Sequence, residues 1–301
     1  MSVGTERDRL TDNLQLIPFV EHRHVTLLHE LLRQNTARLS LGFLGIVIAL
    51  AIFAPLVAPY DPADPNYANT FASPSLQHPF GTDSFGRDIL TRIIYGARIS
   101  LFVGLSVIIL AMTVGISIGL TAGFYSKTPI ETVLMRFIDA LLAFPGIILA
   151  LVIMSVLGPS LRNVIIAISI AQVPGFARLA HGTVLSIKEE EYIMSARAAG
   201  SSNFKIIRRY LLPNAAPTLI VQATIVFAFA ILDEAALSFL GVGSQPPTPS
   251  FGLMILEGQQ YLGDSFWLAF FPGVAIMLTV LSLNFLGDAL RDVLDPKYDS
   301  D

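Results

Sequence analysis

Residues 99–126 read ISLFVGLSVIILAMTVGISIGLTAGFYS and contain no charged side chain. A helix of about 20 predominantly apolar residues crosses a bilayer core, so this stretch is long enough to span a membrane. Four other charge-free windows have comparable length: 39–60, 140–161, 210–232 and 265–287. A sixth window, 164–185, is interrupted by Arg178 and Pro174, which neighbouring helices can accommodate. We therefore predict an all-α, polytopic membrane bundle of six transmembrane helices.

The composition is typical of a membrane protein. Hydrophobic residues make up 53% and charged residues 14% of the chain, whereas a soluble domain carries about 25% charged residues. The net charge of −4 gives no basic footprint for nucleic-acid binding. The absence of cysteine excludes disulfides, thiolate catalysis and cysteine-ligated metal sites. The first 38 residues contain no apolar run typical of a signal peptide, so we expect the first span to be retained.

The distribution of Lys and Arg predicts the orientation, because positive residues are retained on the cytoplasmic side during insertion. If both termini are cytoplasmic, the basic residues on the outside are only four of 19: Arg87, Arg92, Arg98 and Arg162. We divide the chain into a cytoplasmic segment 1–38, a membrane domain 39–290 and a cytoplasmic tail 291–301. The membrane domain includes a cytoplasmic loop at 188–213.

Two predicted outer segments are rich in turn-forming residues. The first, Asp61 to Ile94, contains Gly81-Thr82-Asp83 and Gly86-Arg87-Asp88. These groups could suggest a metal or phosphate site, but turns use the same residue types, so we interpret them as turns or contacts for a binding protein. The second segment runs from Gly241 to Asp264. Its apolar piece 251–256 is too short to cross a membrane, and we expect a re-entrant or interfacial element there.

The cytoplasmic loop contains two predicted short helices separated by a glycine. The first helix has the acidic residues Glu189, Glu190 and Glu191 in its first turn and Gly200 as its C-cap. A second, amphipathic helix follows until Pro213. Two short helices of this kind form a compact knob that another protein could hold in a groove.

This loop resembles the cytoplasmic loop of importer-type ABC permeases, whose pattern is Glu-Ala-Ala, three residues, Gly, nine residues, Ile, one residue, Leu-Pro. Four residues are in register with it: Ala196, Gly200, Leu212 and Pro213. Met194, Ser195 and Tyr210 depart from it, so the family's salt bridge from the Glu is not carried over. In the family, the loop docks on the ATPase subunit. The resemblance implies that role for Glu190, Glu191, Tyr192, Ala196, Arg197, Ala198, Ala199, Gly200, Leu212 and Pro213.

A wider resemblance, over about residues 30–297, is to the second permease of dipeptide, oligopeptide and nickel importers. Four segments carry it: APLVAPYDP at 54–62, HPFGTDSFGRD at 78–88, LSFLGVGSQPP at 237–247 and LGDALRD at 286–292. The resemblance implies a multi-pass, non-catalytic subunit of a prokaryotic cell membrane that forms half of a translocation pathway.

The implied partners are a homologous permease, two ATP-binding subunits and an extracytoplasmic binding protein. ATP and Mg²⁺ would bind to the ATPase partners, and this chain would hold no cofactor or metal. Peptides are the first expected substrate, with nickel complexes or other small solutes as alternatives.

Three acidic residues within the predicted spans require an explanation, because intramembrane charge is costly. Asp139 lies near the start of the third span, whereas Asp233 and Glu234 lie well inside the fifth. These residues either line the translocation route or anchor helix packing. The family often shares Glu234, but the resemblance says nothing about Asp233. His181 stands where the family commonly has Arg, and we interpret it as a surface-facing substitution.

Two other classes of membrane protein fit the sequence less well. An enzyme needs converging catalytic groups, but Asp233 and Glu234 are adjacent and point about 100° apart on a helix. The string Gly115 to Gly119 matches a hydrolase elbow pattern, yet it lies inside a span, where it favours close helix packing. A self-contained channel or secondary transporter often has internal repeats, and none is evident. No phosphate-loop or zinc-protease motif occurs, so energy should come from a partner.

Overall fold

The computed structural model describes residues 30–294. Over this range the chain is helical, apart from loops and one isolated bridge between Thr82 and Asp88. The elements are α3 (Asn35–Ile52), α4 (Ala54–Val57), η1 (Tyr67–Asn69), α5 (Ile89–Phe124), α6 (Pro129–Leu142), α7 (Gly146–Leu157), α8 (Leu161–Ile187), α9 (Glu191–Ala198), α10 (Asn203–Ile206), η2 (Ile207–Leu211), α11 (Leu212–Phe239), α12 (Phe251–Gly258), η3 (Gln259–Tyr261) and α13 (Trp267–Leu294). The predicted all-α class is confirmed.

Five described helical segments are long and apolar enough to cross a membrane. They are α3, α5, α8, the run Asn203–Phe239 that ends in α11, and α13. Helices α6 and α7 satisfy the same criteria together, but they meet at an angle of 89°. The described residues therefore contain six spans when this bent pair is counted as one, in agreement with the predicted number.

The bent pair differs in its bounds from the span expected over 140–161. Helix α6 ends at Leu142 and α7 begins at Gly146, with Phe144 and Pro145 between them. Proline has no N–H to donate and disfavours the helical conformation of the residue before it. The start expected at about 140 is wrong, because the search for charge-free windows excluded the charged residues of α6, and Asp139 lies near the end of α6 instead of near the start of the span.

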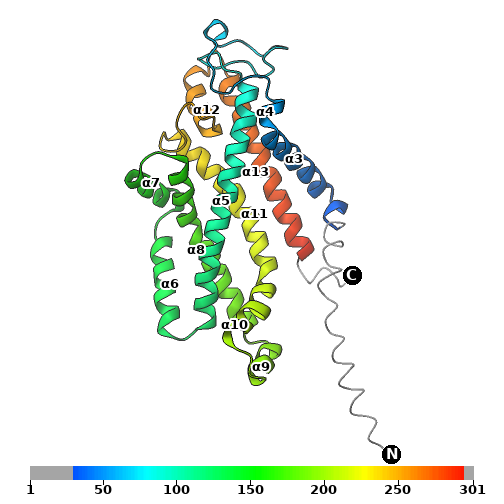
Figure 1. Cartoon of the computed structure of the whole chain (residues 1–301), viewed down its shortest axis with the longest axis vertical. Helices are drawn as coiled ribbons and strands as arrows, with labels where there is room; N and C mark the ends of the chain where they lie inside the picture. Colours follow the sequence, from blue (N-terminus) through cyan, green and yellow to red (C-terminus); the bar gives the residue numbers. More distant parts are fainter. Residues whose placement is uncertain (1–29, 295–301) are drawn as a thin grey trace, which may run out of the picture.

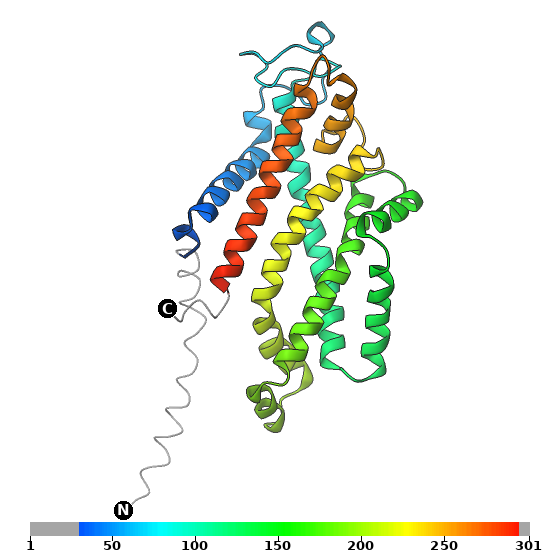
Figure 2. The same ribbon diagram turned by 180° about the vertical axis from the view of Figure 1, so that it is seen from behind.

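Helices α5 and α8 lie side by side through the centre of the bundle (Figure 1, Figure 2). Gly115, Gly119 and Gly123 of α5 face α8, and a Cβ on Gly119 would lie 2.4 Å from the carbonyl oxygen of Ala177 and 2.6 Å from the Cβ of Ala180. Small residues allow two helix backbones to approach closely within a membrane. The string from Gly115 to Gly119 is thus a packing element, as predicted.

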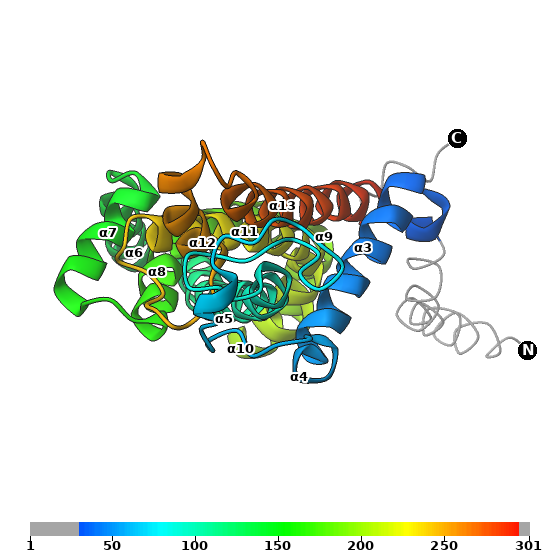
Figure 3. The same cartoon turned by 90° about the horizontal axis from the view of Figure 1, so that it is seen from above.

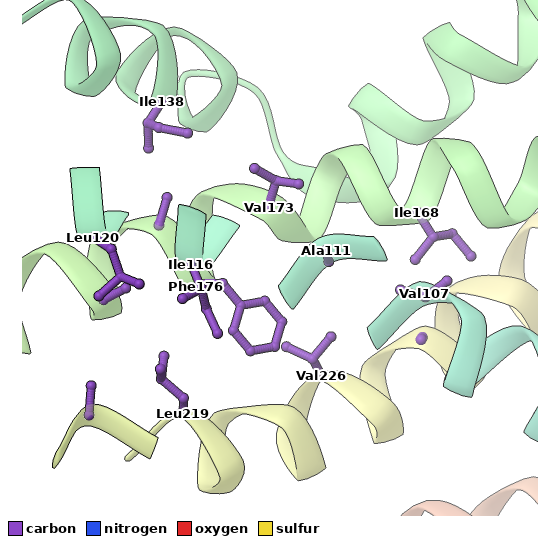
Figure 4. Packing of buried hydrophobic residues seen from close by; sticks show 14 of the residues in the cluster. Val107, Ala111, Ile116, Leu120, Ile138, Ile168, Val173, Phe176, Leu219 and Val226 are labelled. Carbon is purple, nitrogen blue, oxygen red and sulfur yellow. The ribbon is translucent and has the colours of Figure 1, made fainter. Parts of the chain in front are cut away.

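The largest apolar cluster lies around these two helices. Phe176 of α8 is fully buried, and Figure 4 shows its ring beside Ile116 of α5 and Val226 of α11. Ile138 of α6 reaches the same cluster. Because one cluster joins four helices, the core fixes α11 and α6 relative to the central pair.

The bundle has two chemically different ends. At the first, here named the loop end, the segment 58–88 covers the start of α5, and α12 lies beside it (Figure 1, Figure 3). At the opposite end, here named the knob end, α9 and α10 project beyond the long helices (Figure 2). Helix α12 contains the apolar piece expected to be re-entrant or interfacial. It is eight residues long and packs against α11 and α13.

Candidate functional site

The knob end is the first candidate site, and it is anchored by buried apolar side chains. Ile193 of α9, Ile206 of α10 and Leu211 are all fully buried. Helix α9 carries Glu191 in its first turn and Arg197 in its last turn, an arrangement that the helix dipole stabilises. The knob is therefore a packed part of the fold with a defined outer face.

Gly200 ends the first helix of the knob. Its φ is +78°, in the left-handed region, where a residue with a Cβ is strained. The N–H of Gly200 donates to the carbonyl oxygen of Arg197 at 2.9 Å, and the N–H of Ser201 donates to that of Ala196 at 3.0 Å. These bonds satisfy the last carbonyl groups of α9. The structure thus contains the glycine C-cap that the sequence predicts.

The outer face of the knob carries exposed apolar side chains. Met194 is 55% exposed, Phe204 is 71% exposed, and Tyr192 lies near them in sequence with 43% exposure. Partial burial and the negative charge of Glu190 raise the pKa of Tyr192, so its hydroxyl stays neutral near pH 7. Exposed apolar residues rimmed by charged ones are typical of a protein interface. Ala198 and Ala199 are exposed at the end of the same helix.

The knob connects directly to α11. Helix α10 continues into a π-helical turn, Ile207–Leu211, and then into α11, whose first residues are Leu212 and Pro213. On the other side, the guanidinium of Arg197 lies 5.4 Å from the ring centroid of Phe124, at the end of α5. The knob therefore contacts two long helices, α5 and α11.

The loop end contains a buried network of ion pairs. The Nε atom of Arg87 lies 2.7 Å from Oδ2 of Asp83, and Nη2 atoms of Arg87 and Arg92 each lie 3.2 Å from Oε2 of Glu257. Both arginines and Asp83 are buried. Buried charges are stable only when they are paired. The network therefore fastens the segment before α5 to α12.

The other loop residues singled out from the sequence stabilise the same turn. Asp88 caps α5, because its Oδ2 accepts the Thr91 N–H at 2.8 Å, and its Oδ1 lies 3.0 Å from Nδ1 of His78. The Thr82 hydroxyl accepts the N–H of Ala72 at 2.8 Å.

Gly81 and Gly86 have φ values of +78° and +74°. A Cβ at Gly86 would lie 1.8 Å from the carbonyl oxygen of Asn66, so the close approach of these two segments requires glycine. Within residues 30–294, no group of three metal-ligating side chains is found.

Glu234 occupies a closed pocket of hydroxyl groups. It is fully buried in α11, and its carboxylate accepts hydrogen bonds from Ser238 at 2.9 Å, Ser244 at 3.3 Å and Ser100 at 3.4 Å. These serines come from α11, the following loop and α5. Glu234 therefore joins three segments at membrane depth and faces no open surface.

Helices α6 and α8 are joined by polar pairs. Oδ1 of Asp139 lies 2.8 Å from Nη2 of Arg178, and Oε1 of Glu131 lies 2.8 Å from Nε2 of His181. The interpretation of His181 as surface-facing is wrong, because its side chain is largely buried against Glu131. Asp139 and Arg178 are both partly exposed. Through these two pairs, α6 of the bent span is joined to α8 by polar side chains.

Asp233 lies on the face of α11 that meets α8. Its Oδ2 accepts a hydrogen bond from Nε2 of Gln172 at 3.2 Å, and its side chain is partly exposed. Eleven residues earlier, Gln222 lies on nearly the same face of α11, about 20° away at 100° per residue. A Cβ at Gly175 would lie 3.6 Å from Nε2 of Gln222.

Toward the knob end, α8, α11 and α13 line a groove, here named the α8–α11 groove, with a cavity of about 430 Å³. The polar side chains lining it are Thr218, Gln222, Asp288 and Arg291. The polar lining of this groove ends at Gln222, and the exposed apolar residues Ile225, Phe229 and Leu232 follow it along α11 before Asp233.

Sequence reasoning missed several residues of these sites. Gln172 and Gln222 are single amides inside apolar windows, and their polarity was the available signal. Glu257 was equally visible as the one charged residue of α12, but its partners are 165 and 170 residues away. Local patterns cannot pair residues at that separation.

Comparison with known proteins identifies relatives of this architecture. The family described as binding-protein-dependent transport system inner membrane component matches residues 115–300, and the N-terminal TM domain of oligopeptide transport permease C matches residues 26–79. The dipeptide transport system permease protein of Alkalihalophilus pseudofirmus is 47% identical over 90% of this chain and 89% of its own length. The di/tripeptide permease of Pseudomonas aeruginosa is 42% identical over 86% of this chain and 87% of its own. A glutathione permease of Escherichia coli is 43% identical over 88% of each.

Two solved structures share the fold. A chain of the methionine ABC transporter MetNI, in an inward-facing conformation, superposes with a TM-score of 0.58 at 19% identity and covers 69% of this chain and 98% of its own. An amino acid ABC transporter crystallised with histidines gives a TM-score of 0.51 at 16% identity, covering 67% of this chain and 94% of its own.

Proposed function

The chain belongs to the family of binding-protein-dependent transport system inner membrane components, and we propose that it forms half of the translocation pathway of an ATP-driven importer. It is a multi-pass permease of the bacterial inner membrane. A second, homologous permease supplies the other half of the pathway. Two ATP-binding subunits bind ATP and Mg²⁺, and an extracytoplasmic binding protein delivers the substrate. This chain is non-catalytic and holds no cofactor.

The observation that carries this proposal is the polar α8–α11 groove. Elsewhere on the long helices, α11 included, many exposed residues are large and apolar, such as Leu39 of α3, Phe102 of α5 and Phe229 of α11, and suit contact with lipid. Polar side chains at membrane depth are costly in lipid and face protein or water instead. Opposed by a second permease, the groove would enclose a polar path with Gln222 on its wall, and Asp233 would lie farther along α11.

We propose short peptides as the substrate. The relatives are named for dipeptides, for di- and tripeptides and for glutathione, which are all short peptides. A groove lined by amide, hydroxyl and carboxylate groups can exchange hydrogen bonds with peptide N–H and C=O groups. Of the three acids within spans, Asp233 would bind Gln172 of α8, Glu234 would fix helix packing, and Asp139 would support the α6 and α8 contact.

The knob would dock on an ATPase subunit in the cytoplasm. Its exposed apolar side chains, Tyr192, Met194 and Phe204, would fill a groove of that subunit, and Gly200 keeps the knob compact. Movement of the ATPases would displace the knob, and its continuous connection through Leu212 to α11 would move the wall of the groove. Rigid-body movement of this kind belongs to the known repertoire of switching transitions. The loop end, with residues 61–94 and 242–264, would receive the binding protein.

The test is co-purification of the tagged chain from detergent-solubilised native membrane, followed by identification of the bound chains and an ATPase assay. A second permease and an ATPase of the phosphate-loop type are expected. The Gly200→Pro variant, or deletion of residues 194–200, should lose the ATPase and still insert into the membrane. Gly200→Asn is the matched control, because Asn tolerates the left-handed region and should keep the ATPase. Normal transport by the Gly200→Pro variant, or a wild-type chain that transports alone, would contradict the proposal.

A further inference from the structure

The cavity of the α8–α11 groove has the size and lining of a site for a small ligand. Its volume of about 430 Å³ falls within the range of about 300–1,000 Å³ that is typical of such sites. Apolar side chains such as Leu179, Val221 and Ile225 form part of its wall, and the four polar side chains named above form the rest. Apolar walls with a few convergent polar groups are the usual composition of a ligand pocket.

The contact between α11 and α13 positions the polar groups of this cavity. A Cβ at Gly287 of α13 would lie 2.5 Å from Oγ1 of Thr224 of α11, so glycine allows a close approach here. Asp288 and Arg291 follow Gly287 along α13, and Gln222 precedes Thr224 on α11. All three line the cavity. The cavity therefore lies next to this helix contact, with polar groups on two facing helices.

Two of the lining residues carry opposite charges. Asp288 and Arg291 are three residues apart on α13, and side chains at this spacing are neighbours with about 5–6 Å between their Cβ atoms. Both are exposed. Within residues 30–294, neither of them belongs to an ion pair at 4.0 Å or less. The carboxylate and the guanidinium are thus both available to a ligand in the cavity.

A short peptide with free ends has the complementary chemistry. At neutral pH it carries an ammonium at one end and a carboxylate at the other. An extended chain spans at most about 3.3–3.6 Å per residue, so the ends of a dipeptide are about 7 Å apart. This separation is close to that of the two charged side chains. A guanidinium binds a carboxylate through two parallel hydrogen bonds, and a carboxylate accepts hydrogen bonds from an ammonium.

We propose that the α8–α11 groove is a binding site for the charged ends of a short peptide, in which Arg291 binds the carboxylate and Asp288 binds the ammonium. Thr218 and Gln222 of α11 exchange hydrogen bonds with the peptide group between the ends. This inference rests on the proposed function, because it takes the groove as part of the path. The contacts use groups that all short peptides share, so the site accepts peptides with different side chains.

The experiment measures protection of an introduced thiol in the complete importer, in inside-out membrane vesicles. The chain has no cysteine of its own, so labelling of this chain by N-ethylmaleimide reports a single position. Val221→Cys places the thiol in the wall of the cavity and keeps all four polar side chains. Ile225→Cys, at a second lining residue, should give the same pattern. Ser186→Cys is the control, because Ser186 is exposed on α8 and does not line the cavity.

Millimolar Ala-Ala should slow labelling of Val221→Cys by about threefold or more, because the free fraction of a site falls as 1 + [L]/Kd. N-acetyl-Ala-Ala amide, which has no charged end, should give little protection, and Ser186→Cys should react at the same rate with or without peptide. Added Arg291→Gln should abolish the advantage of Ala-Ala over Ala-Ala amide. Added Asp288→Asn should abolish its advantage over N-acetyl-Ala-Ala.

Equal protection by the free and the doubly blocked peptide would overturn the inference, as would full protection by Ala-Ala in the presence of both charge substitutions. Absence of protection in an importer that takes up peptide in cells would also overturn it, and would leave the proposed function standing. Absence of peptide uptake by the wild-type importer would instead refute the proposed function, and this inference with it.

Discussion

Asp233 and Glu234 are adjacent in α11, yet the first is partly exposed beside Gln172 of α8 and the second is fully buried among serine hydroxyls. Glu234 is fully buried and accepts hydrogen bonds from three serine hydroxyls, whereas Asp233 is partly exposed and accepts one from Gln172. The rotation of about 100° per residue separates their environments. Two neighbouring carboxylates therefore have different surroundings, one enclosed by the core and one partly exposed.

Replacement of Glu234 should destabilise the bundle. In Glu234→Ala, the three serine hydroxyls lose their shared acceptor and a cavity forms, which should cost about 3 kcal/mol or more. Glu234→Gln keeps an acceptor oxygen and should cost less. The measurement is the temperature at which half of the detergent-solubilised chain loses its monodisperse peak after heating. An alanine variant as stable as wild type would show that the serine cluster does not join these segments.

The ion network at the loop end should depend on Glu257. Glu257→Gln leaves the guanidinium groups of Arg87 and Arg92 with Asp83 as their only carboxylate within the network. We expect the free energy of unfolding to fall by about 2 kcal/mol or more, since removal of one partner leaves buried positive charge uncompensated. The partial exposure of Glu257 keeps this cost below that of a fully buried pair. Limited proteolysis should cut the segment 58–88 faster in this variant. Asp264→Asn, an exposed control at the same end, should be cut at the wild-type rate.

Replacement by alanine should have opposite effects on stability at Gly119 of α5 and at Gly182 of α8. Alanine normally stabilises a helix relative to glycine by about 1 kcal/mol. At Gly119 the new Cβ would clash with the backbone of Ala177, and the net effect should be a loss of about 1–3 kcal/mol. At Gly182 of α8 a Cβ meets nothing within 4 Å, so Gly182→Ala should be neutral or stabilising. The same heating assay measures both variants, and equal stability of the two would contradict close packing of α5 on α8.

Substitutions at two adjacent residues of α9 should distinguish the folding of the knob from its docking on the ATPase subunit. Ile193 is fully buried and Met194 is 55% exposed. Ile193→Asp should lower thermal stability, because it buries a charge without a partner. Met194→Asp should leave thermal stability unchanged and reduce co-purification of the ATPase subunit at least several-fold. If Met194→Asp retains the ATPase at the wild-type level, this face of the knob is not the docking surface.

The sequence by itself determined the class of the protein. Hydrophobicity is a local property, so charge-free windows predicted the number of spans, and the spacing from Gly200 to Pro213 predicted the knob with its glycine cap. The Gly115 to Gly119 string within a span indicated packing between helices for the same reason. These features depend on residues that are close together in the chain.

Only the tertiary structure decided which polar groups meet. Glu257 pairs with arginines more than 160 residues away, and Gln172 meets Asp233 across 61 residues. The bend between α6 and α7, and the opposite surroundings of Asp233 and Glu234, follow from the backbone break at Pro145 and from the rotation of α11 against α5 and α8. An ion pair or hydrogen bond acts over a few ångströms in space, and the packing of the long helices determines which residues come that close.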